Sequence, residues 1–135
     1  MAGYDAFVIG SAVHMFRWLK DGNKLLRHNR SLLAQRPVWL FSSGPLGTET
    51  TDAQGRDVLE VCQAKEIPEF IEAIHPRDHS MVFGAFFPGK PIGLGERFVA
   101  RIPAAGKAMP EGDFREWEAV EAWAEGIARA LAEAT

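Results

Sequence analysis

The sequence predicts an α/β protein with a parallel sheet and helices on both faces. Short apolar runs, which are typical of buried strands, begin near Asp5, Val38 and Ser80. Segments in which apolar residues recur at helical spacing separate and follow these runs. Strands that alternate with helices in this way form parallel sheets through crossover connections. We therefore predict one doubly wound domain over residues 1–135.

The first predicted strand covers residues 5–9, and Gly10 and Ser11 are expected to end it. Its apolar, partly β-branched composition indicates a strand that is buried on both faces. A helix is predicted over residues 18–34, where apolar residues fall at roughly helical spacing. This helix should end before Pro37, because the residue that precedes a proline avoids helical geometry.

The middle of the chain supplies two more predicted strands. Residues 38–41 and 80–87 are short apolar runs of the kind that forms buried strands. Between them, residues 42–57 read as a polar loop rich in Gly, Ser and Thr. A helix is predicted over residues 69–74, and Pro68 fits its first turn.

The C-terminal part of the chain predicts one helical segment over residues 92–103 and a long final helix over residues 113–134. Asp113 is a suitable N-cap, and Glu116 stands three residues later, as in a capping box. The apolar residues of the long helix recur with a helical period. They form an expected buried stripe of Trp117, Val120, Ala124, Ile127 and Leu131.

Composition narrows the classes of function. Apolar residues make up 47% of the chain, which is enough for a hydrophobic core. The net charge of −3 argues against a nucleic-acid partner, because such surfaces need a basic patch. Cys62 is the single cysteine, so no disulfide forms within the chain, and we expect an inert buried thiol. No apolar run is long enough for an integral membrane segment, and we expect a cytoplasmic location.

Ligands of open α/β sheets bind where the carboxyl ends of the strands enter loops. Two such loops are rich in small residues: GSAVHM, which follows the first predicted strand, and SSGPLG, which follows the second. Small residues let the backbone approach a flat ligand closely. The alternative is that Gly and Ser only end these strands and that the nearby aromatic residues fill the core.

A second polar stretch, HPRDH, contains His75, Asp78 and His79. Two histidines four residues apart on a helix can bind a metal ion. Because Pro76 directly follows His75, helical geometry is disfavoured there. We therefore predict a polar loop that leads into the third strand, and no metal site.

Four stretches of the sequence resemble a known family. They are YDAFVIGSAVHMFRWL, RPVWLFSSGPLG, VFGAFF and EGDFREWEAVEAWAEGIARAL. Together they resemble the flavodoxin-domain proteins, and most closely the branch that contains menaquinone-dependent protoporphyrinogen oxidase. The resemblance runs from Tyr4 to Leu131 and is weakest around TETTDAQGRDVLEV.

The resemblance implies a flavodoxin-like sheet that binds FMN noncovalently. The two loops named above would flank the isoalloxazine ring from opposite sides and set its potential through packing and backbone hydrogen bonds. No side chain is expected to act as a nucleophile. The residues implied are Ser11, Ala12, Val13, His14 and Met15 in the first loop, and Ser42, Ser43, Gly44, Pro45, Leu46 and Gly47 in the second.

In that family, the strand that begins at Tyr4 is the third one, and it pairs with a first strand whose loop holds the FMN phosphate. We therefore expect a sheet truncated at the N-terminus, with about three strands and flanking helices. The first strand would present an open apolar edge. A homodimer that pairs edge to edge is the simplest cover for that edge. A helix that folds back, a separate chain, a wrongly assigned start and a deliberate truncation all stay open.

Two functions of different classes follow from these expectations. The first is FMN-dependent redox chemistry, by electron transfer or by oxidation of a porphyrinogen-like or quinone-linked substrate, with a quinone or redox protein as a possible partner. Without the phosphate loop, FMN would bind weakly, through its ring. The second is a cofactor-free binding or assembly module that pairs through the exposed strand edge. A nonfunctional fragment is a third alternative.

Overall fold

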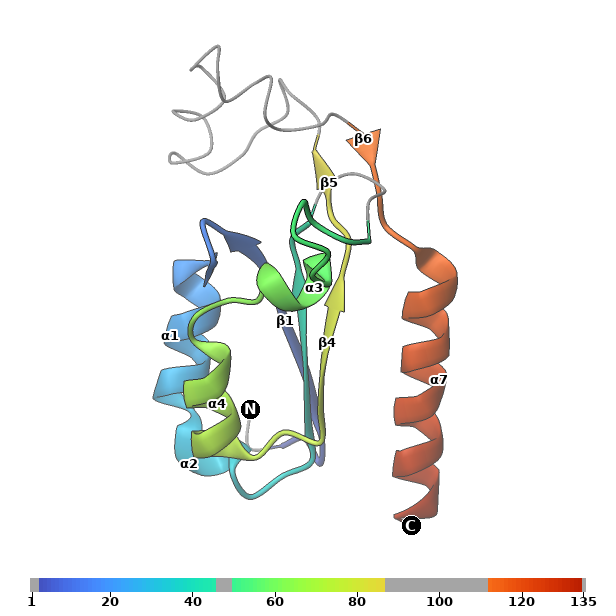
Figure 1. Ribbon diagram of the computed structural model, residues 1–135. Coiled ribbons are helices and arrows are strands. Elements are labelled where there is room, and N and C mark those ends of the chain that lie inside the picture. The colour runs from blue at the N-terminus through green and yellow to red at the C-terminus, as the bar shows by residue number, and fades with distance from the viewer. Residues whose placement is uncertain (1–2, 46–49, 87–111, 135) are drawn as a thin grey trace.

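The computed structural model describes residues 3–45, 50–86 and 112–134, and it is an α/β structure (Figure 1). A four-stranded sheet has the order β2-β1-β3-β4, and a two-stranded sheet pairs β5 with β6. The strands are β1 (Phe7–His14), β2 (Arg17–Trp18), β3 (Val38–Ser43), β4 (Asp78–Val82), β5 (Ala85–Phe86) and β6 (Gly112–Asp113). The helices are α1 (Lys20–His28), α2 (Arg30–Leu33), α3 (Val58–Val61), α4 (Ile67–Ile74) and α7 (Trp117–Glu133).

Three strands of the larger sheet are parallel, as the sequence predicts. β1 pairs with β3 from Phe7↔Val38 to Ala12↔Ser43, and β3 pairs with β4 up to Ser43↔Val82. The fourth strand, β2, turns back from β1 and pairs with it antiparallel. The sheet is therefore mixed, because a hairpin that the sequence analysis did not predict adds one antiparallel strand.

The first strand is longer than predicted. Gly10 and Ser11 do not end it, since β1 continues to His14 and then turns through Met15 and Phe16 into β2. Glycine at position 10 has a packing reason. A Cβ there would lie 2.1 Å from the Phe41 ring, which covers this point of the strand.

The predicted helix over residues 18–34 is divided into α1 and α2, and Trp18 belongs to β2 instead. The break falls at Asn29, which ends α1 and precedes α2. The Asn29 side-chain amide donates to the Leu25 carbonyl at 2.8 Å. The Asn29 backbone N–H donates to the same carbonyl, and the interruption lies in the non-helical backbone of Asn29, with φ −112° and ψ 18°.

The prediction for α4 is confirmed, with Pro68 in the first turn. The helix ends at His75, which has a left-handed backbone with φ 53°. The predicted loop at Asp78 and His79 is wrong, because both residues belong to β4. The predicted strand 80–87 is also divided: β4 ends at Val82, and the short β5 pairs with β6. The helical segment expected over residues 92–103 lies outside the described residues.

The last helix begins later than predicted. Asp113 lies in β6, where its carboxylate binds the Arg115 backbone N–H and guanidinium, so it caps no helix. The helix α7 begins at Trp117 and has no side-chain cap. Of the expected stripe, Ile127 is buried, Val120 and Leu131 are partly buried, and Ala124 and Trp117 are exposed.

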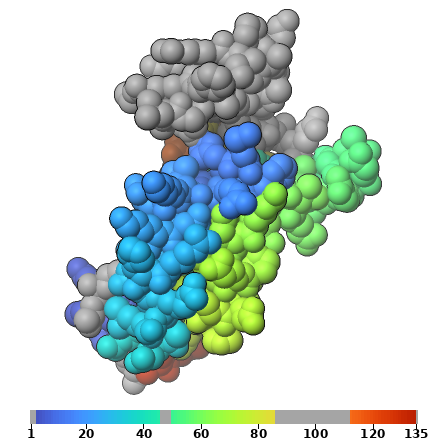
Figure 2. Space-filling view, turned by 90° about the vertical axis from the view of Figure 1, so that its left-hand side faces the viewer, coloured from blue at the N-terminus to red at the C-terminus, as the bar shows by residue number. Residues whose placement is uncertain are grey.

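The sheet separates two layers of helix. The helices α1, α2 and α4 cover one face, and α7 lies on the other (Figure 1). Figure 2 views the first layer, in which α1 and α2 (blue to cyan) lie beside α4 (yellow-green). The hydrophobic core lies beneath this layer and consists of Phe7, Ile9, Trp18, Leu26, Leu33, Val38, Leu40, Ala64, Ile67, Phe70 and Ile74. Among the described residues, no helix has the length and apolarity needed to cross a bilayer.

Candidate functional site

The carboxyl ends of the parallel strands meet at one end of the sheet, which is where the sequence analysis places a ligand (Figure 1). Ala12 of β1 is in register with Ser43 of β3, and Ser43 is in register with Val82 of β4. Just beyond, a Cβ added to Gly44 would lie 3.2 Å from the Val13 side chain. The ends of β1 and β3 are therefore in direct contact.

The first group of predicted site residues does not form a loop. Residues 11–14 are part of β1, and only Met15 lies in the turn. The Ser11 hydroxyl donates to the Ala12 carbonyl at 2.9 Å and accepts from the Leu19 backbone N–H at 3.0 Å. Ser11 therefore fastens the start of α1 to the sheet, a role that the sequence analysis did not anticipate.

The turn between β1 and β2 carries two apolar residues in an unfavourable conformation. Met15 and Phe16 have φ values of 51° and 64°, in the left-handed region that favours Gly or Asn. Their side chains are 83% and 49% exposed. The Phe16 carbonyl accepts a bond from the Lys65 backbone N–H at 2.8 Å, which holds the turn against the chain before α4. Strained, exposed apolar residues of this kind often mark a contact surface.

The second group of predicted residues is only partly accessible. The Ser42 side chain is fully buried on the face covered by α1, α2 and α4, so it lies away from the end of the sheet. Gly44 and Pro45 continue from the end of β3. Gly44 donates to the Val82 carbonyl at 3.2 Å, and Gly84 donates to the Pro45 carbonyl at 2.8 Å. Leu46 and Gly47 lie outside the described residues.

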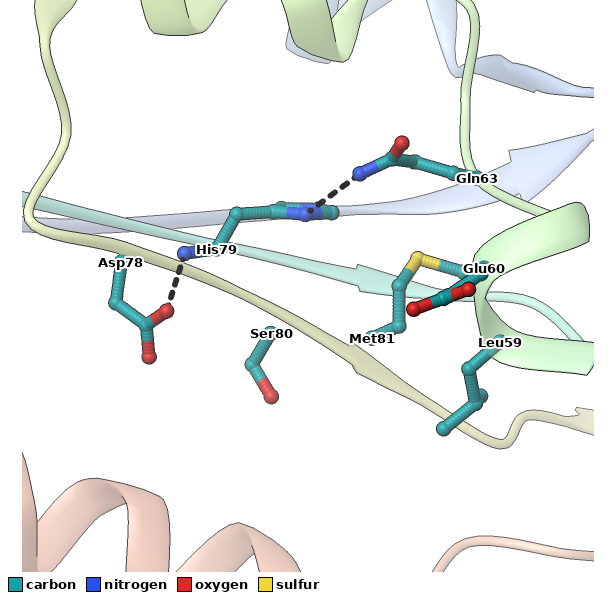
Figure 3. A pocket seen from close by; sticks show the side chains of 7 residues that line it. All are labelled: Leu59, Glu60, Gln63, Asp78, His79, Ser80 and Met81. Carbon is teal, nitrogen blue, oxygen red and sulfur yellow. Dashed lines mark hydrogen bonds between the residues drawn. The ribbon is translucent and has the colours of Figure 1, made fainter. Parts of the chain in front are cut away.

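A chain of hydrogen bonds centred on Ser42 crosses the sheet beneath this site. The Trp18 indole N–H of β2 donates to Ser42 Oγ at 2.7 Å. Ser42 Oγ lies 2.8 Å from Nε2 of His79 in β4. On the far side of the imidazole ring, Nδ1 lies 3.4 Å from the Gln63 side-chain amide nitrogen (Figure 3). Four side chains from β2, β3, β4 and the segment after α3 are thus linked.

His79 also lines an open hollow of about 620 Å³ between α3 and the outer edge of β4. The charged side chains there are Glu60 and Asp78, whereas Leu59 and Met81 supply apolar walls (Figure 3). Burial lowers the pKa of His79, and the neighbouring Asp78 carboxylate acts in the opposite direction. Sequence reasoning had assigned His79 to a loop, and the sequence carries no direct signal that pairs it with Ser42.

A buried carboxylate was missed entirely. Glu66 is 4% exposed. It accepts bonds from the Trp18 backbone N–H at 3.2 Å and from the Asn23 amide at 3.4 Å, and it pairs with the Arg17 guanidinium at 3.4 Å. Glu66 therefore fixes β2 and the beginning of α1 to the N-terminus of α4. The nearby sequence gives only one hint, since Glu66 stands just before the helix-initiating pair Ile67-Pro68.

Beside Glu66, a second open groove of about 540 Å³ runs between β2 and α1. Its cationic residues are Arg17, Lys20, Lys24 and Arg27. Arg27 is neutralised by Glu69, whose carboxylate lies 3.1 Å away. Arg17 is paired with Glu66, so Lys20 and Lys24 supply the excess positive charge of this groove.

Cys62 is partly buried, and burial raises the pKa of its thiol, which fits the expectation of an inert cysteine. Within the described residues, no group of His, Cys, Asp and Glu side chains is placed to hold a metal ion. Comparison with protein-family models, with curated proteins and with solved structures gives no match to this chain.

Proposed function

We propose that the chain is a flavodoxin-like FMN-dependent redox protein whose flavin ring rests on the joined ends of β1 and β3. The observation that carries this proposal is the junction of β1 and β3, where Val13 faces Gly44 and the exposed Met15 follows two residues after Val13. A flat, largely apolar ring needs a close approach of backbone and an apolar wall. The exposed Met15 and Phe16 offer such an apolar wall at this end of the sheet.

A bound flavin supplies one- or two-electron transfer, and the substrate class we propose is a porphyrinogen-like or quinone-linked compound or a redox protein. The chain's own part is to bind and orient the ring. Met15 and Phe16 provide apolar contact, and Val13, whose side chain fills the space beside Gly44, adds an apolar side chain at the junction of β1 and β3. Ser42 takes no part in this contact, because its hydroxyl is already engaged beneath the sheet.

These contacts involve the ring alone, so FMN and riboflavin should bind with similar strength. At about 0.3 kcal/mol per non-hydrogen atom, a ring system of ~20 such atoms gives ~6 kcal/mol, or a Kd of roughly 50 μM. The test is a titration of each flavin, followed by quenching of flavin fluorescence. If the folded protein at millimolar concentration quenched the fluorescence of neither flavin, the proposal would be refuted.

A matched pair of variants locates the binding surface. Met15→Gly removes the exposed side chain, and its φ of 51° suits glycine, so the turn should be preserved. We expect it to weaken flavin binding by roughly fivefold, equivalent to ~1 kcal/mol. The control is Ile71→Ala, which trims another exposed apolar side chain, on α4. Equal effects of the two substitutions would contradict the assignment.

A second function, that of an assembly module, is favoured by the outer edge of β1. Phe7 donates its backbone N–H to Pro37 on the side of β3, so the alternate residues Val8, Gly10 and Ala12 direct their backbone groups to the other side. There β2 pairs with β1 only at Val13 and His14. Among the described residues, no strand pairs with the rest of this edge.

The assembly function makes its own prediction for sedimentation velocity. The wild-type chain should sediment as a dimer, and Val8→Lys should shift it to a monomer, because a charge on an edge strand opposes strand pairing. Ile71→Lys is the control, since it places the same charge on exposed α4. A wild-type chain that is monomeric at high concentration would exclude this function without affecting the flavin proposal.

A further inference from the structure

The hydrogen-bonded chain formed by Trp18, Ser42 and His79 links the turn at one side of the sheet to the hollow at the other. Trp18 is 3% exposed and Ser42 is fully buried, whereas His79 reaches the hollow beside α3. The distances of 2.7 and 2.8 Å are those of well-formed hydrogen bonds. His79 is therefore the most accessible of these three side chains.

The donors and acceptors in this chain are matched in one tautomer of the neutral histidine, and the latch rests on that tautomer. The indole N–H of Trp18 is a donor only, so the Ser42 oxygen accepts from it. The Ser42 hydroxyl proton then has Nε2 of His79 as its acceptor, and the imidazole carries its own proton on Nδ1. Every polar group in the chain is then satisfied with a neutral His79, provided that the Gln63 side-chain amide presents its oxygen, and not its nitrogen, to the Nδ1–H.

Protonation of His79 removes the only acceptor that the described contacts offer to the Ser42 hydroxyl. The imidazolium Nε2 then becomes a donor, so Ser42 Oγ accepts from both the indole N–H and the imidazolium N–H, and its own buried hydroxyl proton is left without an acceptor. A buried donor without an acceptor destabilises its site. Rearrangement that draws Trp18 away from Ser42 relieves this conflict.

We propose that Trp18, Ser42 and His79 form a proton-sensitive latch that holds the β1–β2 turn on the sheet while His79 is neutral and loosens it when His79 is protonated. The latch acts on the turn formed by Met15 and Phe16. Phe16 lies two residues before Trp18 in the chain. It needs no ligand at the strand ends, so it stands independently of the flavin proposal.

The charged groups around His79 decide the pH range of the latch. Asp78 of β4 and Glu60 of α3 line the same hollow, and both carboxylates favour the imidazolium. The Asp78 carboxylate already accepts hydrogen bonds from the His79 backbone N–H and the Trp123 indole N–H. Burial outweighs Asp78, and the pKa of His79 is lowered from its usual 6.5. The unfolded chain therefore takes up the proton first, and stability is lost as the pH falls below about 6.5.

The test is hydrogen exchange of the tryptophan indole protons, measured by NMR at pH 7.5 and at pH 5. Trp117 is 56% exposed and serves as the internal reference for the intrinsic effect of pH. Relative to Trp117, the Trp18 indole should lose roughly tenfold of its protection at the lower pH. The methyl resonance of Met15 should shift with the same midpoint. A Trp18 response without a Met15 response would overturn the link to the turn.

Two variants separate the latch from general loss of structure. His79→Gln cannot be protonated, so the protection of Trp18 should not change between the two pH values. Ser42→Ala removes the central hydroxyl and should leave Trp18 poorly protected at both, while circular dichroism reports whether the fold is kept. If His79→Gln keeps the wild-type pH response, or if wild-type Trp18 protection does not change with pH, the latch is wrong.

Discussion

The two faces of the sheet differ in how completely they are covered. On the face of α1, α2 and α4, Phe7 and Ile9 of β1 are buried with the rest of the core. On the face of α7, the intervening Val8 is 51% exposed. The same strand is therefore interior on one side and accessible on the other. On the side of α7, burial is uneven, since Trp39 of β3 is 5% exposed whereas Val8 on the edge strand β1 is accessible. The difference teaches that only the edge of this second face is open for binding.

The largest expected effect comes from a core substitution on the covered face. Leu40 is fully buried, and Leu40→Ala should lower the free energy of unfolding by about 2–5 kcal/mol, because it leaves a cavity. On the other face, Val8→Ala should change stability by no more than about 0.5 kcal/mol. Urea denaturation measures both values. Similar losses for the two variants would remove the distinction between the faces.

The second largest loss of stability is expected from a polar substitution on the covered face. Glu66→Ala leaves the Trp18 backbone N–H and the Arg17 guanidinium without their buried partner. We expect a loss of roughly 1.5–3 kcal/mol, as for hydrogen bonds to charged groups. Glu66→Gln keeps an acceptor for Trp18 and should cost less. If both variants had the same urea midpoint as the wild type, the contrast between the faces would need revision.

Substitutions in the turn between β1 and β2 should raise the stability of the protein, whereas those above lower it. Replacing Met15 by Asn and Phe16 by Gly installs the pair that a two-residue turn with positive φ prefers. Relief of strain should raise the free energy of unfolding by about 1 kcal/mol. The thermal midpoint measures the gain. A lower midpoint would mean that these side chains pack within the fold and are not held out for a ligand.

A small loss of stability is also expected where α7 contacts the sheet. The Trp123 indole donates to Asp78 at 2.8 Å, and its ring lies edge-on to Phe41 with centroids 6.0 Å apart. Trp123→Phe keeps the ring contact and loses one exposed hydrogen bond, so we expect a cost of about 0.5–1 kcal/mol. A loss as large as that of Leu40→Ala would show that α7 stabilises the sheet as strongly as the other helices do.

Sequence patterns were sufficient for the parallel part of the sheet. The apolar runs that begin near Asp5 and Val38 became β1 and β3, and Pro68 correctly marked the start of α4. The hairpin was missed because its turn, Met15-Phe16, lacks the Asn or Gly that is typical of such turns. The expectation that the first strand is buried on both faces was wrong, since its composition does not reveal how many helices cover each side.

The candidate site was predictable in position but not in detail. The carboxyl ends of the strands follow from the parallel order, so the sequence correctly placed Gly44 after β3 and Met15 after β1, whereas their role in binding stays a prediction. Ser42 looked like a loop residue, because a polar side chain after an apolar run usually ends a strand. Its burial depends on partners far away in the sequence, Trp18 and His79, and no local pattern encodes those contacts.

The glycine at position 10 has a consequence that reaches beyond its own strand. Phe41 lies over it on one side and touches Trp123 of the C-terminal helix on the other. Any larger residue at this point would displace the Phe41 ring. The contact between Phe41 and Trp123, through which α7 packs on the sheet, would then be lost. A mutational scan should therefore find Gly10 to be among the least tolerant accessible positions, although it neither bears a functional group nor belongs to the core.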